Sequence, residues 1–271
     1  MTPTADPRAE GFVWQPNVGV PTFLSAAQVA QFDADGYVLV DDAIPISDIE
    51  RVRDDIDRYE AKAEAHLRTL PDGEAFIAKA DAITFTVHLA ARSVVARDFT
   101  RHPALVAICH DLIGDDVRLY WDQAVYKKPE PAREFPWHQD NGYAFVEPQQ
   151  YLTCWVPLTD ATVDNGCPWV VPGMHRLGTL CHEPSPYGLR CIVEAPDAVP
   201  VEARPGSVVV FSSLTPHRTG PNATSDVRKA YIVQYAPDGA AVVDATTGAR
   251  IVQDDAARQF AVLSGGRPVS G

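Results

Sequence analysis

Three side chains in this sequence have the types and spacing of a metal site. His138, Gln139 and Asp140 form a His-x-Asp triplet, in which an imidazole and a carboxylate could bind one ion. If the segment is a strand, positions two apart face the same side, so both ligands would point toward the same place. The triplet alone is weak evidence, because histidine and aspartate often fall two apart by chance. A third ligand has to come from elsewhere in the fold.

Two later histidines could supply that third ligand. His217 follows the apolar run Val208–Phe211, and Arg228 lies eleven positions further on; His175 has Pro186 at that spacing. Two histidines and one carboxylate leave three coordination positions open, as in the facial triad of non-haem Fe(II) oxygenases. An arginine can hold a carboxylate through two parallel hydrogen bonds. If Arg228 binds the far carboxylate of 2-oxoglutarate, the other end of this keto acid can chelate iron, and one position remains for O₂. We therefore favour His217 as the ligand and expect His175 to be structural.

The elements that must position these residues are short strands in the second half of the chain. Turn signals such as Asn-Gly, Pro-Gly and Asp-Gly separate runs rich in β-branched and aromatic residues, and proline and glycine are frequent, at 23 and 17 of 271 residues. Regularly spaced short strands of this kind indicate a sandwich or barrel. The expected strands are 117–126, 151–158, 169–171, 208–212 and 230–235.

The first 115 residues show helical patterns instead. Ser25–Gln28 has the form of a capping box, and Gly36 can end the helix it opens before a strand at Tyr37–Val40. Ser47–Glu50 predicts a second capped helix, and Pro103 begins a third that Gly114 closes. Helices followed by strands predict an α+β, mainly β, chain with one core.

Composition excludes several classes of protein. The formal net charge is −13 and the pI about 4.9, which disfavours binding to nucleic acid or to anionic membranes. No apolar run approaches the ~18 residues that span a bilayer, and residues 1–15 lack the pattern of a secretory signal. The five cysteines are odd in number and contain no Cys-x-x-Cys pair. They predict buried thiols in a reducing cytoplasm, without disulfides or structural zinc.

The segment from Trp121 to Pro237 resembles the phytanoyl-CoA dioxygenase family of iron- and 2-oxoglutarate-dependent oxygenases. The resemblance rests on the order and spacing of several pieces and leaves out about 20 residues at the start and 30 at the end. These pieces are Asp35–Val38, Tyr126–Pro129, Trp137–Asp140, Trp155–Leu158, Asn165–His175, Pro205–Gly206, Val208–Phe211, His217–Asn222 and Arg228.

The resemblance implies a double-stranded β-helix, a cupin-like jelly roll braced by N-terminal helices. We expect a single catalytic domain over residues 1–271. Its parts would be an N-terminal arm (1–24), a helical support region (25–115), the jelly-roll core (116–240) and a C-terminal extension (241–271).

The resemblance also assigns roles in the site. It implies Fe(II) bound by His138, Asp140 and His217, with O₂ as oxidant, and 2-oxoglutarate as co-substrate. Arg228 and Thr219 would both bind the far carboxylate of 2-oxoglutarate, and Trp155 would pack along the co-substrate. Gln123 would make the polar contact that a lysine makes in some relatives. The implied reaction releases succinate and CO₂ and most often hydroxylates an unactivated C–H bond of a small organic molecule.

Residues near the triplet are candidates for substrate contact. Asn141 and Tyr143 follow Asp140 directly, and segments 44–91 and 187–198 are candidate lids, because loops carry specificity in such scaffolds.

A small basic cluster precedes the triplet. Lys127, Lys128 and Arg133 are expected to form a solvated hairpin end. The alternative is a contact for an anionic substrate such as a CoA phosphate or a carboxylate, and Lys127 is the candidate for it.

Other functions stay open at this stage. A cupin-like protein that binds metal without turnover is one alternative, and a metal-dependent isomerase or cofactor-free dioxygenase is another. Asp140 fills the position that a small residue takes in related halogenases, which argues against halogenation. Desaturation, epoxidation and cyclisation use the same triad. The sequence does not determine the substrate, whether that substrate is attached to a carrier, or whether the reaction belongs to secondary metabolism. It also leaves open which segment forms a lid and what the oligomeric state is.

Overall fold

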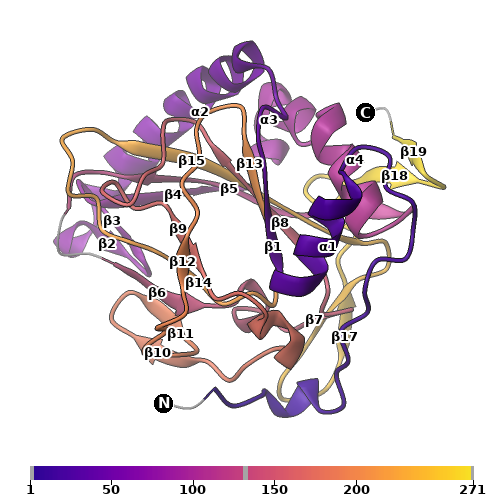
Figure 1. Ribbon diagram of the computed structural model, residues 1–271. Helices are drawn as coiled ribbons and strands as arrows, with labels where there is room; N and C mark the ends of the chain where they lie inside the picture. Colours follow the sequence, from indigo (N-terminus) through magenta and orange to yellow (C-terminus); the bar gives the residue numbers. More distant parts are fainter. Residues whose placement is uncertain (1–2, 131–133, 270–271) are drawn as a thin grey trace.

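The protein is a β-sandwich with helices packed on the outer face of its larger sheet (Figure 1). The structure is a computed structural model and describes residues 3–130 and 134–269. Within these ranges, none of the helices is both long and apolar enough to cross a membrane.

The described residues form four α-helices and five short 3₁₀ turns, most of which lie in the first half of the chain. The first helix begins with the expected capping box, in which Ser25 and Gln28 bond to each other's backbone, and ends at Gly36 in the left-handed region. The bounds are α1 (Ala26–Asp35), α2 (Ile46–Leu67), α3 (Val94–Phe99), α4 (Pro103–Leu112), η1 (Pro7–Ala9), η2 (Pro71–Gly73), η3 (Leu89–Ala91), η4 (Asp140–Gly142) and η5 (Met174–Leu177).

The larger sheet is antiparallel and forms the wall between the helices and the interior of the sandwich. Its strand order is β1-β13-β8-β15-β5-β4-β3-β2, with β18 on β5 and β19 on β18. The bounds are β1 (Tyr37–Val40), β2 (Glu74–Ala75), β3 (Ala78–Lys79), β4 (Ile83–Val87), β5 (Val117–Lys127), β8 (Leu152–Pro157), β13 (Val208–Ser212), β15 (Arg228–Pro237), β18 (Ala261–Ser264) and β19 (Arg267–Pro268).

Side chains of this sheet alternate between two hydrophobic cores. On β13, Val208 and Val210 pack in the core beneath the helices, whereas Val209 and Phe211 pack in the core between the sheets. Because both faces are covered, β13 is apolar from Val208 to Phe211, and all of its residues, including Ser212, are buried. The same alternation on β15 places Tyr231 and Val233 under the helices and leaves the even-numbered positions facing the second sheet.

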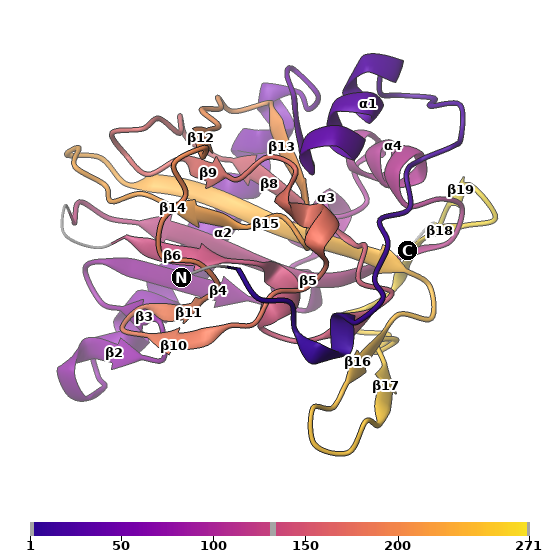
Figure 2. The same cartoon turned by 60° about the horizontal axis from the view of Figure 1, so that its bottom comes forward.

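The second sheet is smaller and faces the first, with the order β12-β9-β14-β6. The hairpin β10–β11 lies beside β6, and a three-stranded sheet near the C-terminus has the order β17-β16-β7 (Figure 2). The bounds are β6 (Phe135–His138), β7 (Val146–Glu147), β9 (Pro168–Val170), β10 (Glu183–Ser185), β11 (Gly188–Arg190), β12 (Val199–Pro200), β14 (His217–Thr219), β16 (Ala241–Val243) and β17 (Arg250–Val252).

The predicted fold class is confirmed, since the chain is mainly antiparallel β with N-terminal helices in the double-stranded β-helix arrangement. Two local expectations differ from the structure. Helix α2 begins at Ile46 after Pro45 and has no side-chain cap, so the Ser47–Glu50 capping box does not form. The first 115 residues are less helical than expected, because β4 (Ile83–Val87) pairs with β5 in the main sheet.

Candidate metal centre and co-substrate site

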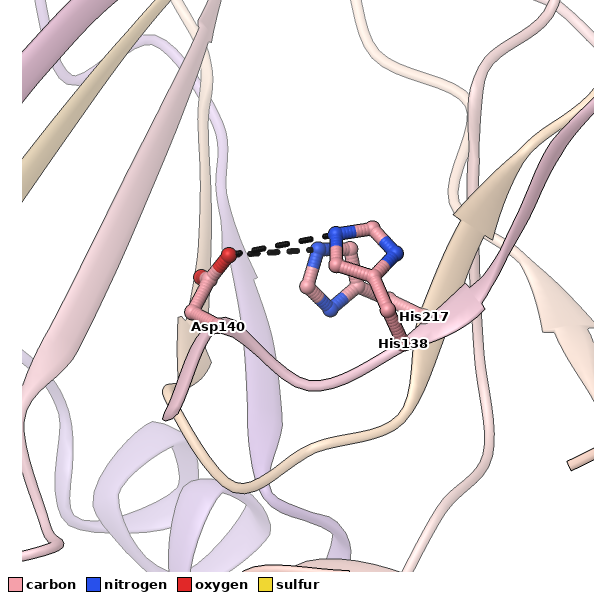
Figure 3. Close-up of side chains that lie close together, drawn as sticks. All are labelled: His138, Asp140 and His217. Atoms are coloured by element: carbon pink, nitrogen blue, oxygen red, sulfur yellow. Dashed lines mark ion pairs between the residues drawn. The ribbon is translucent and has the colours of Figure 1, made fainter. Parts of the chain in front are cut away.

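His138, Asp140 and His217 come together as one cluster between the two sheets (Figure 3). His138 at the end of β6 and His217 at the start of β14 are direct cross-strand partners. The carboxylate oxygen Oδ1 of Asp140 lies 3.9 Å from Nε2 of His138 and 3.8 Å from Nε2 of His217. All three ligand atoms lie within 4.8 Å of one another, so one small cation could bind to all three.

Asp140 reaches the cluster from a turn and not from a strand. The backbone stays extended through Gln139, and Asp140 is the first residue of η4. The expectation that His138 and Asp140 share one strand face is therefore wrong in detail, although both side chains do point to the same place.

Backbone carbonyls orient both imidazoles. Nδ1 of His138 lies 2.9 Å from the Pro136 carbonyl oxygen, and Nδ1 of His217 lies 3.0 Å from that of Thr215. A proton on each Nδ1 leaves the lone pair of Nε2 for a metal, which is the usual outer support of a histidine ligand. Burial lowers the pKa of His138 to about 3 and that of His217 to about 4, so both rings are neutral near pH 7.

A relay of polar side chains fixes Asp140. Thr153 on β8 donates its hydroxyl hydrogen to Oδ2 of Asp140, and Gln234 on β15 donates from Nε2 to the Thr153 oxygen at 3.2 Å. This arrangement leaves Oδ1 directed at the histidines. Burial raises the pKa of Asp140, and a bound cation would oppose that shift by favouring the carboxylate.

Gln139, between the two ligands, is anchored to the segment 178–182. Its side chain donates to the carbonyls of Gly178 and Leu214 and accepts from the Leu180 N–H. Its own N–H donates to Nε2 of His182 at 2.9 Å, while Nδ1 of His182 lies 2.8 Å from the Leu180 carbonyl. Gln139 thus points away from the cluster, as expected, and His182 supports the backbone that carries His138 and Asp140.

Arg228 lies on the larger sheet and faces the interior of the sandwich. It is 1% exposed, and its guanidinium carbon lies 5.3 Å from the centre of the Trp155 ring. Nη1 contacts the Val125 carbonyl at 3.4 Å, but Nε and Nη2 have no hydrogen-bond partner among the described residues. Burial lowers the Arg228 pKa to about 10, which still leaves the side chain charged near pH 7. A buried cation with unpaired N–H groups requires an anion.

Lys127 connects Arg228 to the strand of the distal histidine. It is the cross-strand partner of Arg228, and its Nζ bonds to the carbonyl of Thr219 at 3.2 Å, to the Thr219 hydroxyl at 3.3 Å and to the Gly220 carbonyl. A β-carbon on Gly166 would lie 2.5 Å from the Gly220 carbonyl oxygen, so this turn needs glycine. Lys127 is 2% exposed, which places it inside the site and not at a solvated hairpin end.

The remaining candidates differ in position. Trp155 faces the interior beside Arg228, and Gln123 shares the face of β5 that carries Val125 and Lys127. Asn141 is fully buried, and its side chain bonds to Thr179 and Val146, so it supports the turn after Asp140.

Tyr143, in contrast, is partly exposed. Its ring meets the His138 ring edge-on at 5.4 Å, and its hydroxyl accepts the Leu189 N–H at 3.1 Å.

Two further residues belong to the basic cluster of the sequence analysis. Arg133 lies outside the described residues, and Lys128 pairs with Glu60 and Glu64 of α2.

His175 is not part of the metal cluster. It is fully buried, packs edge-on against Trp14 at 4.4 Å and contacts the Asp33 carbonyl at 3.3 Å through Nε2. The choice of His217 over His175 as the third member of the cluster agrees with this geometry.

These residues fit a divalent iron ion and a dicarboxylate. Two neutral imidazoles and one carboxylate on one side of an ion leave the other positions for small ligands. The unpaired N–H groups of Arg228 suit a carboxylate. A jelly roll with this donor set defines the class of iron- and 2-oxoglutarate-dependent oxygenases.

Comparison with known proteins identifies the family within that class. A sequence model of the phytanoyl-CoA dioxygenase (PhyH) family matches residues 32–230, so the chain belongs to this family of iron- and 2-oxoglutarate-dependent enzymes. A probable phytanoyl-CoA dioxygenase of Caenorhabditis elegans is 28% identical over 80% of this chain and 77% of its own length. An ectoine dioxygenase of Sphingopyxis alaskensis is 26% identical over 74% and 72% of the two chains.

A solved structure agrees with the fold. The epimerase SnoN of nogalamycin biosynthesis, in complex with Fe³⁺, α-ketoglutarate and nogalamycin RO, superposes with a TM-score of 0.63. It is 22% identical to this chain, and the match covers 90% of this chain and 95% of SnoN.

Several supporting residues were not predicted. Thr153 and Gln234 had a signal in the sequence, since Thr153 is the polar residue of strand β8 and Gln234 interrupts the run Ala230–Ala236 of β15, which is otherwise free of charged and amide side chains. His182 had none, because its bond to Gln139 joins positions 43 residues apart.

Proposed function

We propose that this enzyme hydroxylates an unactivated C–H bond of a small organic molecule, using His138, Asp140 and His217 as iron ligands. In the balanced reaction, R–H, O₂ and 2-oxoglutarate give R–OH, succinate and CO₂. The observation that carries the proposal is the fully buried Arg228 with two unpaired N–H groups, in the same interior as the three potential ligands. A buried cation in the same interior as a potential metal site suits a keto acid that is bound at one end by the metal and at the other by Arg228.

The protein groups act by binding and orienting. Nε2 of each histidine and Oδ1 of Asp140 would hold the metal, and Arg228 would bind the far carboxylate of 2-oxoglutarate, assisted by the Thr219 hydroxyl. When bound, iron together with 2-oxoglutarate supplies the O₂ activation that oxidises the C–H bond. The two sheets exclude bulk water, since the His138 and His217 side chains are 9% and 8% exposed.

Trp155 would pack along the co-substrate, because its ring lies beside Arg228. Gln123 is a weaker candidate for a polar contact, and Lys127 is better placed for one because it bonds to Thr219. Lys127 therefore belongs with the co-substrate residues in this proposal, and not with substrate contacts.

The relatives carry different reactions in their names, including dioxygenase and epimerase. Hydroxylation can be separated from desaturation, cyclisation and epimerisation with ¹⁸O₂, because only a hydroxylated or epoxidised product gains the label. Cys109, Cys154, Cys167 and Cys191 are buried as predicted, whereas Cys181 is exposed, so the prediction of buried thiols is wrong for that residue. The cytoplasmic location stays a prediction.

The test begins with metal-free protein to which Fe(II), ascorbate, 2-oxoglutarate and candidate substrates are added. Succinate and an ¹⁸O-labelled alcohol are the expected products, and Asp140→Ala should form neither. Binding of 2-oxoglutarate without succinate formation under any condition would instead favour a silent binding protein. Activity that survives Arg228→Ala would favour chemistry that needs no keto acid.

A further inference from the structure

Aromatic side chains line one side of the metal cluster. The Phe135 ring meets the His138 ring edge-on at 4.8 Å, and the Tyr143 ring does so at 5.4 Å. Phe85 on β4 extends this row, with its ring centre 6.0 Å from that of Phe135. We call Phe85, Phe135 and Tyr143 the aromatic row.

The aromatic row is not sealed in the core. Tyr143 is 36% exposed, and Phe85 and Phe135 are partly exposed, although His138 beside them is buried. Phe211, whose ring lies on the other side of the cluster beside His217, is by contrast 1% exposed. Partly exposed aromatic faces next to a reactive centre are a usual feature of small-molecule sites.

Gly188 and Ile77 lie next to the aromatic row. A β-carbon built on Gly188 would lie 2.6 Å from the Tyr143 hydroxyl oxygen and 3.5 Å from both Ile77 Cγ2 and Phe135 Cζ. Gly188 therefore lets β11 pass close over the aromatic row, and Tyr143 holds that strand through the Leu189 N–H.

Apart from Arg228, which the proposed function assigns to 2-oxoglutarate, five described cations around the aromatic row already have partners. Lys127 bonds to Thr219 and Gly220, and Lys128 pairs with Glu60 and Glu64. The other three pairs are Lys79 with Glu74, Arg190 with Glu183, and Arg218 with Glu134. With a net charge of −13, the chain also repels polyanions at long range.

We propose that the substrate is an uncharged compound with a flat apolar ring system, which packs on the aromatic row, and not an acyl-CoA or a phosphate. This inference rests on the proposed function, because it places that substrate beside the same metal cluster. Offset or edge-on stacking on Tyr143 and Phe135 would hold a planar ring. A thioester of CoA would bring phosphates to a place where the five described cations named above are already bonded and Arg228 is assigned to 2-oxoglutarate.

The test measures binding separately from turnover. Protein loaded with Mn(II) and 2-oxoglutarate is titrated with 2-naphthol, 2-naphthyl phosphate or octanoyl-CoA, and paramagnetic broadening of the ligand proton signals reports binding near the metal. We expect 2-naphthol to bind at least tenfold more tightly than either anion.

Variants assign that binding to the rings. Tyr143→Leu and Phe135→Leu keep an apolar side chain but remove the π face, and each should weaken 2-naphthol binding about tenfold. Tyr143→Phe keeps the ring and loses only the bond to the Leu189 N–H, so it should bind 2-naphthol more tightly than Tyr143→Leu. Phe23→Leu, which removes an exposed ring beside α4, is the matched control and should change nothing.

Tighter binding of either anion would overturn the inference, as would 2-naphthol binding that is absent or unaffected by the two leucine variants. Consumption of 2-oxoglutarate is measured in air on the same protein reconstituted with Fe(II) and ascorbate in place of Mn(II). Consumption without 2-naphthol binding refutes the substrate class only, whereas binding without any consumption refutes the proposed function only.

Discussion

Replacing Arg228 by methionine should weaken 2-oxoglutarate binding and, at the same time, stabilise the ligand-free protein. The wild-type side chain offers two unpaired N–H groups, Nε and Nη2, to a carboxylate. A hydrogen bond to a charged group contributes about 1.5–3 kcal/mol, so losing two costs about 3–6 kcal/mol. The dissociation constant of 2-oxoglutarate should therefore rise about 10²- to 10⁴-fold.

The expected gain in stability of the ligand-free variant also follows from the poorly compensated buried charge of Arg228. Burial lowers the pKa of Arg228 to about 10, which shows that the folded state disfavours its charge. The contacts that oppose this are a long hydrogen bond to Val125 at 3.4 Å and the Trp155 ring at 5.3 Å. Apolar replacement of poorly compensated buried ions stabilises by about 1–3 kcal/mol. For a chain of this length, that raises Tm by about 2–6 °C.

The assay is thermal unfolding of Mn(II)-loaded protein with and without 2-oxoglutarate, in a buffer free of phosphate and carboxylates. Wild type should gain about 2.7 kcal/mol at a ligand concentration 100 times its Kd, and Arg228→Met should gain at most about 0.4 kcal/mol at the same concentration. Lys229→Met is the matched control. That neighbouring cation is paired with Asp57 of α2, so its loss should lower Tm slightly and leave the response to 2-oxoglutarate intact.

Two results would refute this reasoning. A lower Tm for ligand-free Arg228→Met would mean that the guanidinium is well solvated or paired in the folded protein. A normal shift with 2-oxoglutarate would mean that its far carboxylate binds elsewhere.

Three further predictions concern the histidines. His217→Ala should weaken Mn(II) binding at least about 100-fold by EPR, whereas His175→Ala should keep the metal and lower Tm by about 4–8 °C through loss of buried packing. His182→Ala should weaken Mn(II) binding about tenfold by freeing the Gln139 backbone, and His182→Gln, which keeps a donor and an acceptor, should restore part of it. Burial lowers the His175 pKa to about 4. Its ring thus stays neutral in the folded state while the unfolded chain takes up a proton below about pH 6.5. The free energy of unfolding should therefore fall between about pH 6.5 and 4, more steeply in wild type than in His175→Asn, as measured by urea unfolding.

Each of these has a contrary result. Metal loss in His175→Ala with retention in His217→Ala would reverse the assignment of the distal ligand. Unchanged Mn(II) affinity in His182→Ala would show that Gln139 is held by its side-chain bonds alone, and equal pH slopes would show that His175 does not set the acid sensitivity.

The sequence predicted those parts of the site that depend on local order. His138, Asp140 and His217 could be found because their neighbours carry family motifs, and the strand Val208–Ser212 could be found because both of its faces are apolar. Strand β4 was missed, since Ile83–Val87 is short and follows a helix whose pattern dominates the region.

The position of Lys127 could not be predicted either. A lysine in a basic run is normally solvated, and only the register between β5 and β15, together with the approach of Gly220, buries it. Contacts that join distant segments leave no periodic signal in the chain, which is also why His182 was not recognised.

The pairing of His138 with His217 has a consequence for biosynthesis. The two ligands are separated by 79 positions, so a ribosome that adds ~5–20 residues per second exposes the second one about 4–16 s after the first. Arg228 follows later still, and the N-terminal arm that pairs Ala5 with Leu180 must wait for most of the chain before it can close over the ligand segment. Until His217 has been made, a nascent chain therefore presents at most the pair His138 and Asp140 of the metal cluster. The complete cluster can form only after synthesis has passed residue 217, so any metal that needs all three groups would bind after that point.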